Sequence, residues 1–397
     1  MAFWLRPQLL SGYTKYVGKK AMKKILLFVL VILAVLIGLF YINPQVKPAH
    51  MEPYLALSEE SQAPPPSADD VVQRVLLYGD AGHSSTDPWQ PSMAKVAARA
   101  SMLPERTIVI ALGDNIYYEG FPRKEAGQQE WTDDQLESIS YLDAQLKVAE
   151  VSGASLYLVP GNHDWYATEV DSQALYIEQY GRENNANVFF EPRAREGMTL
   201  PKSRDLPGFS VVFVDSQWWL TGDEQHKSEA AMTEEFARIR QEHPENLIIV
   251  AQHHPLVTEG PHGGYLSDFR YWLIMNILYQ VFPDAASQDT QDPNYQQMIQ
   301  AQNRVMRQYD GVIHAAGHEH SLQLMQPSKG TSASYLLVSG AGNSNKVSGI
   351  WHNDSTRFAH SKEGFIELDI TASGVYFRAF SIHRQTPTAE FWLDLSL

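Results

Sequence analysis

Side chains that can bind metal ions follow five strand-like apolar runs of this sequence. The motifs after these runs are Gly79-Asp80, Gly113-Asp114-Asn115-Ile116-Tyr117, Gly161-Asn162-His163-Asp164, His253-His254-Pro255 and Gly317-His318-Glu319-His320. Binding sites of α/β proteins lie in the loops beyond the carboxyl ends of strands, where these motifs stand. Carboxylate, phenol, amide and imidazole groups without sulfur suit iron, manganese or zinc. The pattern therefore predicts a metal centre, and a carboxylate bridging two ions about 3.5–4 Å apart is the arrangement of two-metal phosphoryl chemistry.

Each motif alone also has an ordinary structural explanation. Asp80 and Asp114 could form turns or cap helices, Asn162 could stabilise a turn, and Tyr117 could pack over the sheet edge. Five motifs in order, each at a strand end, favour the metal interpretation. Of the adjacent His253 and His254 we expect one ligand, and His253 is favoured because it comes first after the strand.

Other polar and aromatic residues near these motifs receive structural interpretations. Asp164 is expected to orient His163 rather than to bind a metal. Tyr118 is expected to serve in packing, and the pair Trp218-Trp219 is interpreted as core, with a rim near the site as the alternative. Histidines outside the motifs are interpreted as structural or surface residues; they are His83, His314, His352, His360 and His383.

The motifs need a scaffold of alternating strands and helices. Strands are predicted over 75–78, 107–112, 155–159, 209–214, 247–251, 312–315, 334–338, 364–369 and 375–381. Helices are predicted over 91–102, 133–151 and 223–242. Strand–helix alternation followed by clustered strands predicts an α/β sandwich with two facing sheets.

The composition excludes several classes of function. There is no cysteine among the 397 residues, which rules out disulfides, thiolate metal sites and cysteine nucleophiles. The formal net charge is −15, and residues 1–50 hold seven basic and no acidic residues, so the remainder carries 24 basic against 46 acidic residues. A body with a charge of −22 argues against non-specific nucleic-acid binding, which requires clustered lysine and arginine.

The N-terminal part predicts a membrane anchor. Residues 25–42 contain no charge and approach the roughly 20 apolar residues that a bilayer requires. Four lysines shortly before this run predict that residues 1–24 form a basic cytoplasmic tail and that the rest faces outward. The run exceeds the apolar core of a cleaved signal and no A-x-A site follows it, so we expect an uncleaved signal anchor. The predicted location is a single-pass inner or plasma membrane protein whose catalytic domain is periplasmic or extracellular.

The rest of the chain divides into three predicted parts. The proline-rich residues 43–70 read as an extended linker. Residues 71–385 are the predicted catalytic domain, with a helical insertion at 264–310 to which no role is assigned. Residues 386–397 are predicted to be a C-terminal tail.

The ordered motifs resemble those of the calcineurin-like metallophosphoesterases, and more narrowly the purple acid phosphatases of the tartrate-resistant type. The wider superfamily usually begins with Asp-x-His, but Gly82 stands at the histidine position here. In purple acid phosphatases a tyrosine three residues after the second aspartate compensates, and Tyr117 stands there. His262, nine residues after His253, also fits, as does the run from Gly317 to Gln323 that leads into Ser339-Gly-Ala-Gly-Asn343.

The resemblance implies a four-layer α-β-β-α sandwich with two facing mixed β-sheets, preceded by one transmembrane helix. It implies a binuclear centre of ferric iron and a divalent iron, zinc or manganese ion. The implied ligands are Asp80, Tyr117 and His320 for the ferric ion, Asn162, His253 and His318 for the divalent ion, and Asp114 as the bridge. His163 and His262 are implied to bind phosphate and to protonate the leaving group.

The predicted activity is an acid phosphatase that hydrolyses small phosphate monoesters through attack of a metal-bound hydroxide. Two alternatives remain open. One is a phosphodiesterase that acts on nucleotide or lipid-headgroup phosphoesters with the same metal site. The other is a non-catalytic surface protein that keeps the fold for binding, against which the complete ligand set argues.

Overall fold

The computed structural model describes residues 53–56, 63–166, 170–194, 198–221, 225–263, 288–343 and 347–395. They belong to one compact unit, Pro48–Leu266 with Asn276–Leu397. The predicted tail 1–24 and anchor 25–42 lie outside the described residues, as do residues 264–287 of the predicted insertion. Within the described ranges, no helix is both long and apolar enough to cross a bilayer.

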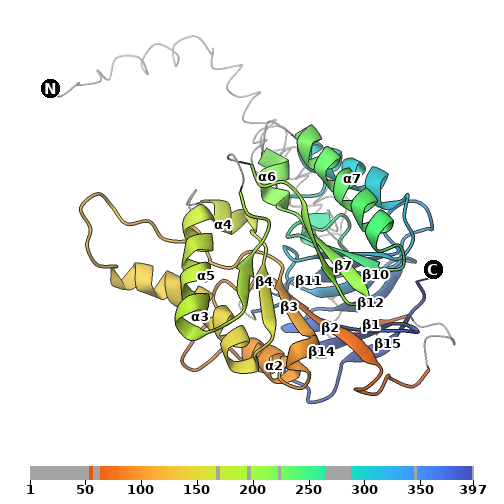
Figure 1. The fold of residues 1–397 in the computed structure, drawn as a ribbon, viewed down its shortest axis with the longest axis horizontal. Coiled ribbons are helices and arrows are strands. Elements are labelled where there is room, and N and C mark those ends of the chain that lie inside the picture. Colours follow the sequence, from red (N-terminus) through yellow and green to blue (C-terminus); the bar gives the residue numbers. More distant parts are fainter. Residues whose placement is uncertain are drawn as a thin grey trace, which may run out of the picture. The chain divides into compact units, whose positions relative to one another are not determined.

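Two mixed β-sheets form the body of this unit and confirm the α/β fold (Figure 1). Sheet A runs in the order β1 (Tyr54–Leu55), β12 (Thr356–His360), β10 (Leu322–Met325), β11 (Tyr335–Ser339), β9 (Val312–Ala316), β8 (Leu247–Ala251), β7 (Phe209–Phe213) and β6 (Lys202–Leu206). Sheet B runs in the order β15 (Ala389–Leu393), β14 (Gly374–Ser381), β13 (Gly364–Thr371), β2 (Val71–Tyr78), β3 (Thr107–Ala111), β4 (Ser155–Leu158) and β5 (Val188–Phe190). The five strands that carry the metal motifs are parallel to their motif-bearing neighbours, namely β2–β3–β4 in one sheet and β8–β9 in the other.

The two sheets share a core because alternate side chains of each strand point to opposite faces. Val75 and Leu77 of β2 belong to the same buried cluster as Ile249 of β8 and Ile313 of β9. The intervening Leu76 belongs to a second cluster with side chains of the helices on the other face of sheet B. Strands buried on both faces read as continuous apolar runs, which explains why they could be located in the sequence.

Helices cover the outer faces of the sheets (Figure 1). The helices on sheet B are α2 (Pro91–Ala100), α3 (Asp133–Ser152), α4 (Asn162–Tyr166) and α5 (Val170–Asn184), and those on sheet A are α6 (Ser216–Thr221), α7 (Gln225–Glu242) and α9 (Pro293–Met306). The start and end of α3 follow directly from its sequence. Thr132 and Gln135 form a reciprocal capping box, and Gly153 ends the helix in the left-handed conformation with φ 75°.

The chain ends of the domain differ from the sequence prediction. Residues 386–397 were expected to form a tail, but Ala389–Leu393 is the edge strand β15, which pairs with β14. The expected linker 43–70 contributes the short strand β1, which pairs with β12. Trp392 of β15 also donates a hydrogen bond from Nε1 to the carbonyl of Pro64 at 3.0 Å. Both segments therefore belong to the folded domain over these residues.

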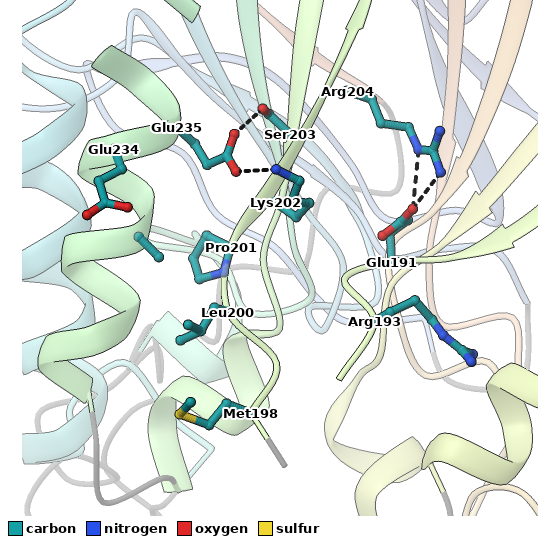
Figure 2. Close-up of a pocket in the computed structure, with 11 residues that line it drawn as sticks. Glu191, Arg193, Met198, Leu200, Pro201, Lys202, Ser203, Arg204, Glu234 and Glu235 are labelled. Atoms are coloured by element: carbon teal, nitrogen blue, oxygen red, sulfur yellow. Dashed lines mark hydrogen bonds and ion pairs between the residues drawn. The ribbon is translucent and has the colours of Figure 1, made fainter. Parts of the chain in front are cut away.

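Two ion pairs link β6, the edge strand of sheet A, to neighbouring elements (Figure 2). Arg204 of β6 donates to the carboxylate of Glu191, which follows β5, with Nη2 at 2.8 Å. Lys202, also on β6, pairs at 2.7 Å with Glu235 of α7. The two contacts hold the edge strand of sheet A against both the opposite sheet and its own covering helix.

One buried carboxylate predicts how stability depends on pH. Asp215, which follows β7, accepts hydrogen bonds from Trp165 Nε1, Thr199 Oγ1 and the backbone NH of Trp218. Burial raises its pKa from 3.8 to about 7, so the folded state binds its proton more tightly than the unfolded chain. The stability that this proton contributes is present below pH 4 and is lost as pH rises through 7.

We predict that the wild-type protein loses roughly 3 kcal/mol of stability relative to Asp215→Asn between pH 4 and pH 7. Denaturant unfolding of both proteins across this range measures the difference. The exposed Asp354→Asn serves as a control that should parallel the wild type. A constant difference between wild type and Asp215→Asn would contradict the prediction.

Candidate metal centre

The five motifs meet at the carboxyl ends of the central strands of both sheets. Asp80, Asp114 and Asn162 follow β2, β3 and β4 of sheet B, whereas His253 and His318 follow β8 and β9 of sheet A. All five side chains are buried. The structure thus brings together residues that are up to 238 positions apart in the chain, as the contact of His318 with Asp80 illustrates.

Asp80, Tyr117 and His320 form the first group of candidate ligands. The hydroxyl of Tyr117 lies 3.1 Å from Oδ1 of Asp80 and 3.1 Å from Nε2 of His320. Nε2 of His320 lies 3.2 Å from the same Asp80 oxygen. Three donor atoms from three loops therefore converge on one point.

Asn162, His253 and His318 form the second group. Nε2 of His253 lies 3.0 Å from Oδ1 of Asn162 and 3.2 Å from Nδ1 of His318. Asp114 lies between the two groups, because its Oδ1 is 3.4 Å from Nε2 of His253 and its carboxylate also hydrogen-bonds to the Tyr117 side chain. Donor atoms of Asp80, Asp114 and His253 lie within 4.8 Å of one another.

The backbone is strained at three of these positions. Asp80, Asp114 and His318 have φ values of 59°, 53° and 66°, in the left-handed region that residues with a Cβ seldom adopt. Such strain persists where the surrounding structure imposes it, and it concentrates at functional sites. Glycine is required opposite one of them, because a Cβ on Gly161 would collide with Oδ1 of Asp114.

Gly82 has no room for a side chain, which explains why a tyrosine takes part here. A Cβ at this position would lie 2.6 Å from the backbone nitrogen of Tyr117 and 2.8 Å from the carbonyl oxygen of Asp114. The same nitrogen of Tyr117 donates to the carbonyl of Gly82 at 3.0 Å. A histidine at position 82 is therefore incompatible with the loop conformation that directs the Tyr117 hydroxyl to Asp80.

His163 and His262 flank the two groups and are more exposed than the candidate ligands. His163 Nδ1 lies 2.6 Å from the carbonyl of Tyr118, so this nitrogen donates, and Nε2 lies 4.0 Å from Oδ2 of Asp114. His262 Nδ1 lies 2.7 Å from Oδ1 of Asp289, and its ring centroid is 4.2 Å from that of His318. In each of these two histidines, Nδ1 is hydrogen-bonded to a protein oxygen, and Nε2 is the ring nitrogen that this bond does not use.

Asp164 has a different role from the one expected. Instead of contacting His163, it accepts hydrogen bonds from the backbone of Gly161 at 2.7 Å and from the backbone and side chain of Asn115 at 3.2 and 3.0 Å. Gln173 of α5 donates to it at 3.1 Å. Asp164 therefore ties the loop after β3 to the loop after β4 and fixes the spacing between Asp114 and Asn162.

The sequence analysis missed the residues that hold the histidines of sheet A. His254 bonds through Nδ1 to Ser216 at 2.8 Å and through Nε2 to Gln288 at 2.7 Å, which occupies both of its ring nitrogens. The carbonyl of Gln288 also lies 2.7 Å from Nε2 of His318. Gln288 and Asp289 lie in the insertion to which no role was assigned, and no local periodicity marked them.

The electrostatics of the site fit the binding of cations. Over the described residues, the ion pairs of Asp80 and Asp114 involve histidines and no lysine or arginine. Burial raises the pKa of Asp80, but hydrogen bonds and charges from His320, His253 and Tyr117 outweigh burial and lower it. Burial and the charges of Asp80 and Asp114 raise the pKa of Tyr117 well above 10, so its phenol loses a proton only if a cation binds.

The donor set therefore fits a two-ion centre, with oxygen donors predominant around Asp80 and imidazole donors around His253. The arrangement of two mixed sheets with such a centre at their carboxyl ends is that of a metal-dependent hydrolase. Residues 74–322 match the model of the calcineurin-like phosphoesterase family. The chain belongs to this family, which confirms the broader of the two resemblances seen in the sequence.

The solved structures that the comparison finds share little sequence with the chain. GAP50, described as the anchor in the inner membrane complex of Plasmodium, is 14% identical over 81% of this chain and 89% of that chain, with a TM-score of 0.49. PhoD is 12% identical over 82% of this chain and 69% of that chain, with a TM-score of 0.48. The phosphopantetheinyl hydrolase PptH from Mycobacterium tuberculosis is 12% identical over 66% and 88%, with a TM-score of 0.30. A comparison with curated proteins finds no match.

We predict that Asp114→Ala removes both ions, because its carboxylate lies between the two groups of ligands. Metal analysis of the purified full-length protein measures the loss, and circular dichroism checks the fold. Asn162→Ala is the matched variant, and it should retain one ion per chain. Two ions bound to folded Asp114→Ala protein would contradict the bridging position.

Proposed function

We propose that this protein is a binuclear acid phosphatase of the purple type that hydrolyses phosphate monoesters. Asp80, Tyr117 and His320 would hold a ferric ion, Asn162, His253 and His318 a divalent iron, zinc or manganese ion, and Asp114 would bridge the two. The observation that carries this proposal is the position of the Tyr117 hydroxyl, 3.1 Å from both Asp80 Oδ1 and His320 Nε2. A phenolate is a hard, anionic oxygen ligand, and ferric iron favours such ligands.

The bound ions would supply Lewis acidity, which neutralises charge on the phosphoryl oxygens and lowers the pKa of a bound water. The protein's own side chains position the substrate and supply the proton. His163, whose Nδ1 donates to the carbonyl of Tyr118, presents Nε2 on the side of Asp114, where the protonated imidazole can donate a hydrogen bond to a phosphoryl oxygen. His262 is then the group that remains for protonating the departing alcohol.

Asp289 prepares His262 for this role. Its carboxylate accepts from Nδ1 at 2.7 Å, so Nε2 is the nitrogen that can deliver a proton to the leaving group. Burial lowers the pKa of His262, but the hydrogen bond to Asp289 and the charges of Glu319 and Asp289 outweigh burial and raise it. A general acid works below its pKa, so a raised pKa extends activity toward neutral pH.

The location of the enzyme forms part of the proposal. An uncleaved anchor at 25–42 with a lysine-rich tail before it would hold the catalytic domain on the outer face of the inner or plasma membrane. Membrane attachment through this helix and a small phosphoester substrate are the interactions that we propose. We propose no binding of nucleic acid, because the acidic composition argues against it.

Colour and metal content test the proposed ferric site. The full-length protein, purified in detergent, should hold about two ions per chain and absorb visible light through phenolate-to-iron charge transfer. We predict that Tyr117→Phe loses this band while remaining folded, whereas the neighbouring Tyr118→Phe keeps it. A colourless protein with two zinc or manganese ions would remove ferric iron from the proposal, and a band that survives in Tyr117→Phe would remove Tyr117.

The role of Asp289 is tested by the dependence of rate on pH and leaving group. We predict that Asp289→Asn lowers kcat about tenfold for alkyl phosphates, because a well-placed general acid contributes roughly 10²–10⁴. The alkaline limb of the kcat/KM profile should move to lower pH, since the pKa of His262 falls without the carboxylate. Aryl phosphates, whose leaving groups need less protonation, should be affected less, and an equal loss for both classes would count against this role.

A further inference from the structure

A cavity of about 660 Å³ adjoins the metal centre and shares Tyr117 with it as a wall. It lies between the loop that follows β3 and the first turns of α3. The hydroxyl of Tyr117 points to Asp80, while its ring faces His83, with ring centroids 5.0 Å apart. One aromatic ring therefore separates this cavity from the candidate ligands.

Aromatic side chains form one wall of the cavity. The ring of His83 lies 4.9 Å from that of Tyr118 and 5.3 Å from that of Tyr141, in edge-to-face geometry with both. Tyr118 is 55% exposed, so its ring is accessible to a molecule in the cavity. The faces of such rings carry negative charge density and attract organic cations.

Carboxylates form the rim of the same cavity. Glu119, Asp134 and Glu137 line it against a single lining cation, Arg123. Glu137 is held in place by the Tyr141 hydroxyl, which donates to Oε1 at 2.7 Å. Aromatic rings beside fixed carboxylates are complementary to an ammonium group and repel anionic substituents.

The backbone connects this cavity to His163, the residue proposed to bind phosphate. The carbonyl of Tyr118 bonds to Nδ1 of His163 at 2.6 Å, and the ring of Tyr117 meets the His163 ring edge to face at 4.6 Å. A phosphate bound by His163 would lie next to the loop that supplies Tyr118, one wall of the cavity. The carbon chain of the ester can extend from there into the cavity, whereas the ester oxygen must stay within reach of His262 for protonation.

We propose that this cavity is the subsite for the alcohol portion of the substrate and that it selects alcohols bearing an ammonium group, as in choline phosphate. The inference rests on the proposed phosphatase function and names its substrate class. A neutral aromatic alcohol would use the rings but not the carboxylates, and an acidic sugar phosphate would be repelled by Glu119 and Glu137. The subsite would therefore discriminate between substrates by the charge on the alcohol portion.

The test compares two substrates that differ in that charge alone. Choline phosphate and 3,3-dimethylbutyl phosphate have the same shape, because a carbon replaces the quaternary nitrogen in the second. For the full-length protein in detergent, kcat/KM should be about tenfold or more higher for choline phosphate. A ratio near one, with both substrates turned over, would overturn the subsite and leave the phosphatase function standing.

Variants assign the preference to the cavity. Glu137→Gln and Tyr118→Leu should each bring the ratio of the two kcat/KM values toward one, by removing a carboxylate or a ring. Glu125→Gln is the matched control, since it removes an exposed carboxylate of the loop before α3 that does not line the cavity. A ratio that falls equally in Glu125→Gln would show a general charge effect and overturn the assignment.

Absence of turnover with both substrates would refute the proposed function, and direct binding then decides the subsite. Calorimetric titration with choline alone measures this without any reaction. Binding that Glu137→Gln abolishes and Glu125→Gln retains would support a cation site, whereas no binding to the wild type would overturn it.

Discussion

The constraint on which this structure depends is a pair of buried carboxylates, Asp80 and Asp114, which over the described residues form ion pairs with histidines but with no lysine or arginine. Asp80 and Asp114 carry like charges in a site shielded from water, where their repulsion is weakly screened. Histidines and a phenol surround them, and these groups offset the repulsion only in part. Bound cations would remove the remaining repulsion between the two carboxylates. The strained loops, the glycines packed against them and the hydrogen bonds of Asp164 hold the two carboxylates close together.

The packed core of the two-sheet sandwich holds these loops in place. Five motif-bearing strands from two sheets share one core, so each loop begins at a rigid, buried strand end. Left-handed residues at Asp80, Asp114 and His318 turn the chain abruptly enough to bring side chains inward from both sheets. Burial of the strands therefore balances the cost of strain and charge at their ends.

The sequence allowed prediction of the strands and candidate ligands because both leave local signals. Strands buried on both faces are continuous apolar runs, and Gly-Asp or Gly-His pairs follow them directly. Asp289 and Gln288 left no such signal, because their roles arise from contacts across the fold with His262 and His254. Strand β15 has a readable alternation of buried and exposed residues and pairs with β14, which was predicted over 375–381, so the sequence did carry a signal for it. Asp164 was predicted to orient His163 because the two residues are adjacent in the sequence. Its actual partner Asn115 lies in another loop, and sequence proximity could not indicate that contact.

The position of β2 in sheet B has a consequence for biosynthesis. The strand that presents Asp80 pairs on one side with β3, which follows it closely, and on the other with β13, which begins only at Gly364. During synthesis one edge of β2 stays open until nearly the whole chain has emerged, and early segments wait for late ones. The sheet around Asp80 is therefore completed late, and the ion site reaches its final form only when most of the chain has been made.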